Sequence, residues 1–167
     1  MANVVEAGAL DGLFRRYSRS VLRRAAAILG DGDAAKDLTQ EVFLRAMRAG
    51  AEFTEADSPI AWLYRVTTNL CLNRLRDQHR RQRILESASP APHPPAQPAV
   101  DAALTVREIL ERMPPELQEI GVYYFVDSMS QEEIAAIIGL PRRTVGYRLE
   151  QFRSRVFEVA PRKELAS

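Results

Sequence analysis

The sequence predicts an all-α fold of two small helical domains joined by a proline-rich linker, the second domain being a helix-turn-helix. Apolar residues recur at steps of three and four along most of the chain, and no stretch alternates as a strand does. Residues 87–99 contain five prolines and, apart from His93, no charged residue, so neither a helix nor a packed core is expected there. We therefore expect domains at residues 1–86 and 101–167, with a flexible linker at residues 87–100.

Three long helices are expected in the first domain. Apolar side chains from Leu10 onward form the stripe of an amphipathic helix, and Gly30-Asp31-Gly32 ends it. Asp33 can cap a second helix, and Ser58 followed by Pro59 is a helix start with proline at the first position. The expected helices are Leu10–Leu29, Asp33–Ala49 and Ser58–Arg83, with a polar loop at Phe53–Asp57.

The second domain is expected to contain four helices. Pro114 and Pro115 end one helix and start the next. Ser130 and Glu133 are spaced as a capping box, in which each side chain accepts from the other's backbone N–H. Short helix, glycine turn and longer basic helix then form a helix-turn-helix. The expected helices run from Asp101 to Arg112, from Pro115 through Phe125, from Gln131 through Ile138 and from Pro141 to Val156, the last turning Val145, Leu149 and Phe152 toward the core.

Composition excludes several classes of protein. Of the 167 residues, 46% are hydrophobic and 27% charged, as in soluble globular proteins, and no apolar run approaches the roughly 18 residues of a membrane span. Residues 1–10 show no signal-peptide pattern, so we expect a cytoplasmic protein without membrane insertion. Cys71 reads as a small buried hydrophobe, and the isolated His79 and His93 support no metal site.

No motif of an enzyme is present in the sequence. It lacks a Gly-rich phosphate loop, a Ser-His-Asp set and a paired-carboxylate motif. We therefore expect no catalytic residue, no cofactor and no metal.

Charge is segregated along the chain although the formal net charge is only +1. Residues 30–57 hold three basic and seven acidic side chains, a net −4, and residues 61–86 hold six and two, a net +4. Residues 101–139 hold two and eight, a net −6, and residues 140–163 hold seven and two, a net +5. Each half is acidic first and basic second, which suits a protein that bridges a basic protein surface and a nucleic acid. The alternative is a set of ordinary solvated helix faces.

Five segments, in order along the chain, resemble the extracytoplasmic-function sigma factors of bacterial RNA polymerase. They are Leu13–Tyr17, Asp37–Ala46 and Trp62–Leu70, similar to region two of that family, and Leu110–Pro114 and Gln131–Gly139, similar to region four. The resemblance implies an alternative sigma factor that binds core RNA polymerase and directs it to promoters. It also implies promoter DNA as a partner, both as duplex and as non-template single strand, and an anti-sigma factor.

The resemblance places Asp37, Gln40 and Glu41 on the helix that grips the polymerase clamp. Asp37 and Glu41 are four residues apart and so share a helix face, suited to basic residues of a partner. The alternative is that these acids merely complement the helix dipole.

For the minus-ten element, the resemblance points to the loop from Phe53 to Ile60 and to Asn69, which would hold a base flipped from the non-template strand. An asparagine amide offers both a donor and an acceptor to a base edge, although Asn69 could instead bond between helices. Trp62 either stacks on a base or belongs to the core, the second being favoured. Arginines that follow are suited to phosphate contacts, or form a solvated face: Arg74, Arg76, Arg80, Arg81 and Arg83.

The last helix is expected to enter the major groove of the minus-thirty-five element. Its candidate DNA contacts are Arg142, Arg143, Thr144, Tyr147, Arg148 and Gln151. Gly146 departs from the family pattern, which has a basic or polar residue there, and a helical glycine costs about 1 kcal/mol against alanine.

Two other functions remain open on the sequence alone. A stand-alone helix-turn-helix regulator explains residues 115–158 but gives no role to Asp37–Arg45 or Asn69. A sigma-like module that only sequesters an anti-sigma factor leaves the arginine-rich segment and the basic last helix unused.

Overall fold

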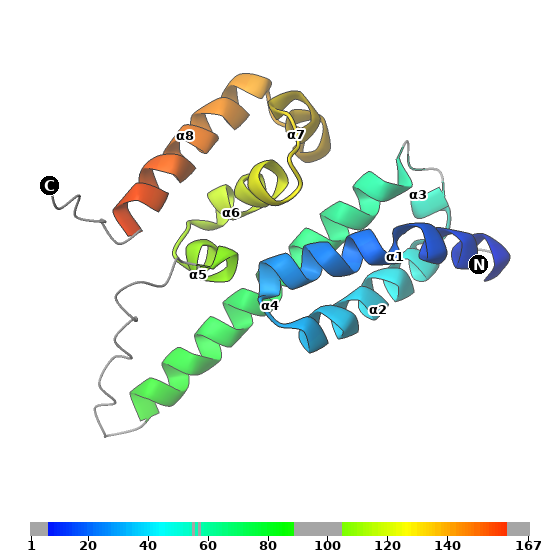
Figure 1. Ribbon diagram of the computed structural model, residues 1–167, viewed down its shortest axis with the longest axis horizontal. Coiled ribbons are helices and arrows are strands. Elements are labelled where there is room, and N and C mark those ends of the chain that lie inside the picture. Colours follow the sequence, from blue (N-terminus) through cyan, green and yellow to red (C-terminus); the bar gives the residue numbers. More distant parts are fainter. Residues whose placement is uncertain (1–6, 55, 57, 89–104, 160–167) are drawn as a thin grey trace, which may run out of the picture.

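The protein is all-α in the computed structural model, which describes residues 7–54, 56, 58–88 and 105–159. All of the regular structure in these residues is helical, as the sequence predicts. The elements are α1 (Ala7–Leu29), α2 (Gly32–Ala49), α3 (Ala51–Thr54), α4 (Pro59–Ala88), α5 (Val106–Glu111), α6 (Pro115–Gly121), the π-helical segment η1 (Val122–Val126), α7 (Gln131–Ile138) and α8 (Arg142–Val159). Figure 1 shows α1, α2 and α4 side by side, with α5 to α8 on the other side of α1 and α4 from α2.

In the first domain, α1, α2 and α4 contact one another around one apolar core. The apolar stripes that predicted the helices supply it: Val21, Ala25, Ile28 and Leu29 from α1, Leu38, Val42, Phe43 and Ala46 from α2, and Leu63, Cys71, Leu72 and Leu75 from α4. Burial of these side chains fixes which faces of α2 and α4 are left for solvent or partners.

Local signals set most helix ends, with two differences from the prediction. Asp31 caps α2, its side chain accepting from the backbone of Asp33 and Ala34, where Asp33 was the expected cap. The expected loop after α2 begins instead with the short helix α3, which holds Phe53. Ser58 does start α4, accepting from the Ala61 backbone at 3.4 Å.

The second domain follows the predicted order of helices. Thr105 and Glu108 form a capping box at the start of α5, and Ser130 forms the predicted one with Glu133 at the start of α7. Residues 101–104, predicted to be helical, lie outside the described residues. Gly139 ends α7 in the left-handed conformation, with φ +69°, which glycine adopts without a steric cost.

The two domains share a core. Leu110, Met113, Leu117, Val122 and Phe152 of the second domain lie in the same buried cluster as the core of the first. A second cluster, of Ile120, Tyr123, Ile134, Val145 and Leu149, lies within the second domain. Of the predicted linker, residues 87 and 88 belong to α4 and residues 89–100 lie outside the described residues. None of the helices described here is long and apolar enough to span a membrane.

Candidate nucleic-acid interface

The outer face of α2 carries the residues predicted to contact polymerase. Asp37, Gln40 and Glu41 are all exposed, because the apolar residues between them face the core. Glu41 accepts from Arg45 Nη2 at 2.7 Å, within the same helix. Asp37 has no such partner in the described residues. The face therefore presents one free carboxylate, one paired carboxylate and a neutral amide.

Asn69 lies exposed on α4, on a different face from the buried Thr67 and Thr68. Its side chain makes no hydrogen bond within the part of the chain that the structure describes. An interhelical role for this amide is therefore not supported, whereas its donor and acceptor are available to an outside group.

Phe53 does not lie where a DNA contact would have to lie. Its side chain is fully buried, at 0% exposure, and its ring packs edge-on against Trp62 with the centroids 5.1 Å apart. This corrects the expectation that Phe53 touches DNA, since a buried ring has no surface to offer a base. Trp62 is partly buried against the same core and donates from Nε1 to Glu52 at 3.4 Å. The core interpretation of Trp62 agrees with this packing.

The arginines of α4 line two hollows. Arg74 is half-buried, and with Arg81 and Glu41 it borders a cavity of about 430 Å³ between α2 and α4. Arg76 and Arg80 are exposed, and with Arg83 they border a second cavity, of about 490 Å³, which Glu111 and Gln118 of the second domain also line. Guanidinium groups, which bind phosphates, border both hollows, beside the carboxylates of Glu41 and Asp77 in the first and of Glu111 in the second.

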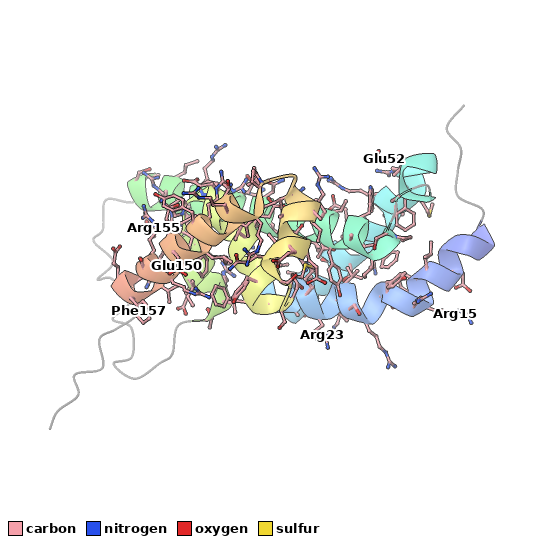
Figure 2. The ribbon with its side chains drawn as sticks, turned by 90° about the horizontal axis from the view of Figure 1, so that it is seen from above. Arg15, Arg23, Glu52, Glu150, Arg155 and Phe157 are labelled. Atoms are coloured by element: carbon pink, nitrogen blue, oxygen red, sulfur yellow. The ribbon has the colours of Figure 1, made fainter. Side chains whose placement is uncertain are left out.

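On α8, the predicted division into a core face and an outer face is present. Val145, Leu149 and Phe152 are buried, while Arg142, Arg143, Tyr147 and Gln151 are exposed and Thr144 and Arg148 are half-buried. Tyr147 is 66% exposed, and its hydroxyl accepts from Gln151 Nε2 at 3.3 Å. Figure 2 shows α8, with Glu150, Arg155 and Phe157, at the opposite end of the molecule from Arg15 and Glu52.

Several basic side chains of the second domain are already engaged. Arg142 pairs with Glu132 of α7. Arg153 pairs with Glu150 and lies over the ring of Tyr124, 5.4 Å from its centroid. Arg143 and Arg155 are exposed and form no ion pair among the described residues. These two are the arginines of α8 with most freedom to meet DNA.

Gly146 lies where α8 passes the start of α7. A Cβ at this position would lie 3.1 Å from Gln131 Oε1, a tight approach to the end of a flexible side chain. Gly146 therefore leaves the outer face of α8 without a side chain at this position. It also allows the start of α7 to lie close to α8.

A buried cluster around Arg24 was not predicted from the sequence. Arg24 of α1 is only 2% exposed and pairs with Asp127, at the end of η1. It also donates to Thr68 Oγ1 of α4 and lies over the rings of Tyr64 and Tyr123. Burial raises the pKa of the Asp127 carboxyl above its ordinary value, and Arg24 opposes that rise. The signal in the sequence is a charged residue on the apolar stripe of α1, three residues after Val21 and four before Ile28.

The metal-binding and nucleophilic side chains of the described residues do not form a metal or catalytic site. Among the described residues, no group of three or more His, Cys, Asp and Glu side chains could hold a metal ion. Cys71 is fully buried, and this burial raises the pKa of its thiol to about 12. The buried-hydrophobe interpretation of Cys71 is confirmed.

Two family models match the chain. Residues 13–81 match Sigma-70 region 2 and residues 103–156 match Sigma-70 region 4. Among curated relatives, SigE of Mycolicibacterium smegmatis, an ECF RNA polymerase sigma factor, is 32% identical over 87% of this chain. SigM of Mycobacterium tuberculosis, also an ECF RNA polymerase sigma factor, is 31% identical over 89% of this chain and 75% of its own length. The chain spans 59% of the length of SigE.

Two solved structures share the fold. RpoE of Bartonella quintana, in complex with the anti-sigma factor NepR, matches with a TM-score of 0.60 over 90% of this chain and 95% of its own, at 20% identity. CnrH, in complex with the cytosolic domain of CnrY, matches with a TM-score of 0.57 over 90% of this chain and 86% of its own, at 24% identity. Both matches concern the fold. The region 2 and region 4 matches and the identity to SigM show that this chain belongs to the ECF family of RNA polymerase sigma factors.

Proposed function

We propose that the protein acts as an alternative sigma factor, which binds core RNA polymerase, directs it to specific promoters and helps to open the DNA. Asp37, Gln40 and Glu41 on α2 would contact polymerase, and Asn69 with the arginines of α4 would hold the minus-ten element. The outer face of α8 would enter the major groove at the minus-thirty-five element. Strand opening would be driven by binding energy, without nucleotide hydrolysis by this chain.

The observation that carries this proposal is the segregation of exposed polar groups in both domains. On α2 the acidic residues face outward, as a contact with a basic partner requires. On α4 and α8 arginine is the most frequent exposed residue, and Asn69, Tyr147 and Gln151 are exposed as well. Arginines supply affinity for phosphates, whereas amides and a phenol can read bases.

Transcription in vitro with purified core polymerase and a genomic fragment library, followed by mapping of start sites, tests the proposal. Defined start sites that require the protein are expected. Reversing charge in the double variant Asp37→Lys, Glu41→Lys should weaken core binding at least about tenfold, or ~1.4 kcal/mol, with far-UV circular dichroism unchanged. The matched control, Asp11→Lys with Glu116→Lys, reverses two exposed acids outside α2 and should bind as the wild type does. DNA binding without any core binding would instead favour a stand-alone regulator.

An anti-sigma factor is a further proposed partner. Two solved structures of the same fold were each determined in complex with another protein: the sigma factor RpoE with the anti-sigma factor NepR, and CnrH with the cytosolic domain of CnrY. Since core polymerase and promoter DNA lie in the cytoplasm, the protein would act there.

A further inference from the structure

The outer face of α8 has a gap at Gly146. Arg143 and Tyr147, on either side of it, are exposed, and so is Arg142, one helical turn before it. Gly146 itself contributes only backbone to this face. The surface that would enter the major groove therefore lacks a side chain near its middle.

A side chain from the neighbouring helix α7 lies over this gap. A Cβ at Gly146 would lie 3.1 Å from Oε1 of Gln131 and 3.8 Å from its Cδ. The Gln131 amide thus occupies the place where a side chain of residue 146 would begin. This amide makes no hydrogen bond within the described residues, and neither of its polar atoms is buried. Its donor and its acceptor are therefore available to an outside group.

The start of α7 is held in a fixed position against α8. Ser130, just before Gln131, forms the capping box with Glu133, in which Ser130 N–H donates to Glu133 Oε2 at 2.7 Å. Glu132, just after it, pairs with Arg142 of α8. Both helices also bury side chains in the second apolar cluster, and Figure 1 shows α7 beside the start of α8. A backbone fixed on both sides of Gln131 holds the amide near the α8 surface before DNA arrives, which lowers the entropic cost of a contact.

We propose that Gln131 reads a base of the minus-thirty-five element, supplying from α7 the side chain that α8 lacks at Gly146. Because Gly146 has no side chain, DNA can approach the α8 backbone closely at this point, which brings the amide within reach of a base edge. In the major groove a glutamine amide pairs with adenine, donating from Nε2 to N7 and accepting from N6 at Oε1. The inference rests on the proposed function, because it names a base that the second domain reads.

Randomised-site selection with holoenzyme tests this assignment. The wild type should select adenine at one position of the minus-thirty-five element, and Gln131→Ala should lower that preference at least about fivefold, the lower limit for a bidentate contact. Gln131→Glu keeps the length of the side chain but can only accept, so the preference at the same position should move from adenine toward cytosine, whose N4 amino group donates. A purely structural role of Gln131 would not change which base is preferred.

Gly146→Leu tests the link between the two residues. Leucine would occupy the place of the amide without offering a hydrogen bond of its own, so Gly146→Leu should lose the same base preference as Gln131→Ala. The double variant should lose no more of it than either single variant does. Far-UV circular dichroism should stay unchanged, since residue 131 is the first of α7 and leucine favours a helix more than glycine does. Gln82→Ala, which removes an exposed glutamine of α4, is the matched control and should select the wild-type sequence.

Two results would overturn the inference alone. One is a selected sequence that Gln131→Ala leaves unchanged, and the other is an affinity that Gln131→Ala lowers alike for all sequences, as the loss of a phosphate contact does. In both cases the wild type still selects a sequence, so the proposed function stands. A wild-type holoenzyme that selects no sequence would overturn the proposed function together with the reading role of Gln131.

Discussion

Asn69 has an exposed side chain, as its proposed contact with a base requires. Its side chain is exposed on α4 and bonds to no other described residue. Asn69→Ala should therefore leave the fold and core binding unchanged while impairing open-complex formation at a promoter, since the amide is proposed to meet a base only after strand separation. Permanganate footprinting of the opened strand measures the effect. Wild-type permanganate reactivity would contradict the proposed role, and a lowered melting temperature would indicate a structural one.

Cys71 gives a prediction about reactivity. Burial raises the pKa of its thiol from 9.0 to about 12, so the thiolate is scarce at neutral pH and the sulfur is also out of reach. Modification by a thiol reagent should be slow in the native protein and fast in denaturant, with a rate that follows global or local opening. Rapid stoichiometric modification of the native protein would show that α4 opens at this position.

Exposure of side chains was largely predictable from the sequence, because helical spacing separates a buried face from an outer one. The same spacing does not tell whether an aromatic residue in a short loop turns inward, and Phe53 was assigned to DNA on the resemblance alone. In the structure α3 places Phe53 against Trp62, and the apolar area of the ring is better buried there than left in water.

Helix α7 supports a prediction about pH, through its capping box. Ser130 N–H donates to Glu133 Oε2 at 2.7 Å, and this bond lowers the pKa of the Glu133 carboxyl below its ordinary value of 4.5. Because the pKa is lower in the folded state, the stability gained is fully present above the unfolded-state pKa and is lost as pH falls through the folded-state pKa. A carbon-13 titration of the Glu133 carboxyl should give a midpoint below 4.5. Glu133→Gln should remove this part of the acid dependence of stability, and a midpoint at or above the ordinary value would contradict the cap.

The outer face of α8 yields a prediction that separates base reading from phosphate binding. Changing Arg143, near the start of the helix, to alanine should cost roughly 1–3 kcal/mol of binding free energy at one base pair and relax the preference for that base pair. Changing Arg155, farther along the helix, to alanine should weaken binding to all sequences alike. Gly146→Arg should raise DNA affinity generally once Gln131 has moved aside. Randomised-site selection with holoenzyme distinguishes these outcomes, and identical selected motifs for the wild type and all variants would mean that α8 does not read sequence in this way.

At the scale of elements, the sequence predicted helices well and their local irregularities less well. Ser130 predicts the start of α7 as its N-cap, and Gly139 predicts its end as a left-handed C-cap. Both ends of α7 lie at these residues. Asp31 and Asp33 are equally good caps, and only the geometry of the turn after Gly30 chooses Asp31. The π-helical turn of η1 has no comparable signal, since Val, Tyr and Phe favour strands by propensity and do not distinguish one type of helix from another.

For the whole molecule, the sequence predicted two domains but not their contact. Arg24 lies on the apolar stripe of α1, which is a sign that its charge is neutralised somewhere, yet nothing near it in sequence says where. Its partner Asp127 is 103 positions away and looks like an ordinary turn residue. Pairings across such a separation depend on how the domains pack, which helical periodicity does not encode.

The shared core leads to a prediction about cooperativity. A Cβ at Gly121, in α6, would lie 2.3 Å from Cε2 of Phe152, and that ring is held by the stacked ring of Phe125 and by the shared core. Gly121→Ala should therefore destabilise the second domain by about 1–3 kcal/mol through overpacking. The matched control is Gly12→Ala in α1, where an added Cβ meets no atom within 4 Å and alanine favours the helix.

Trp62 makes the coupling between domains measurable, because it is the only tryptophan and lies in the first domain. If the two domains unfold as one unit, Gly121→Ala should shift the denaturant midpoint of Trp62 fluorescence and that of far-UV circular dichroism together, although the substitution is in the other domain. Gly12→Ala should not lower either midpoint. A Trp62 transition that Gly121→Ala leaves unchanged, with a separate earlier step in circular dichroism, would show that the domains unfold independently and that the shared core does not couple them.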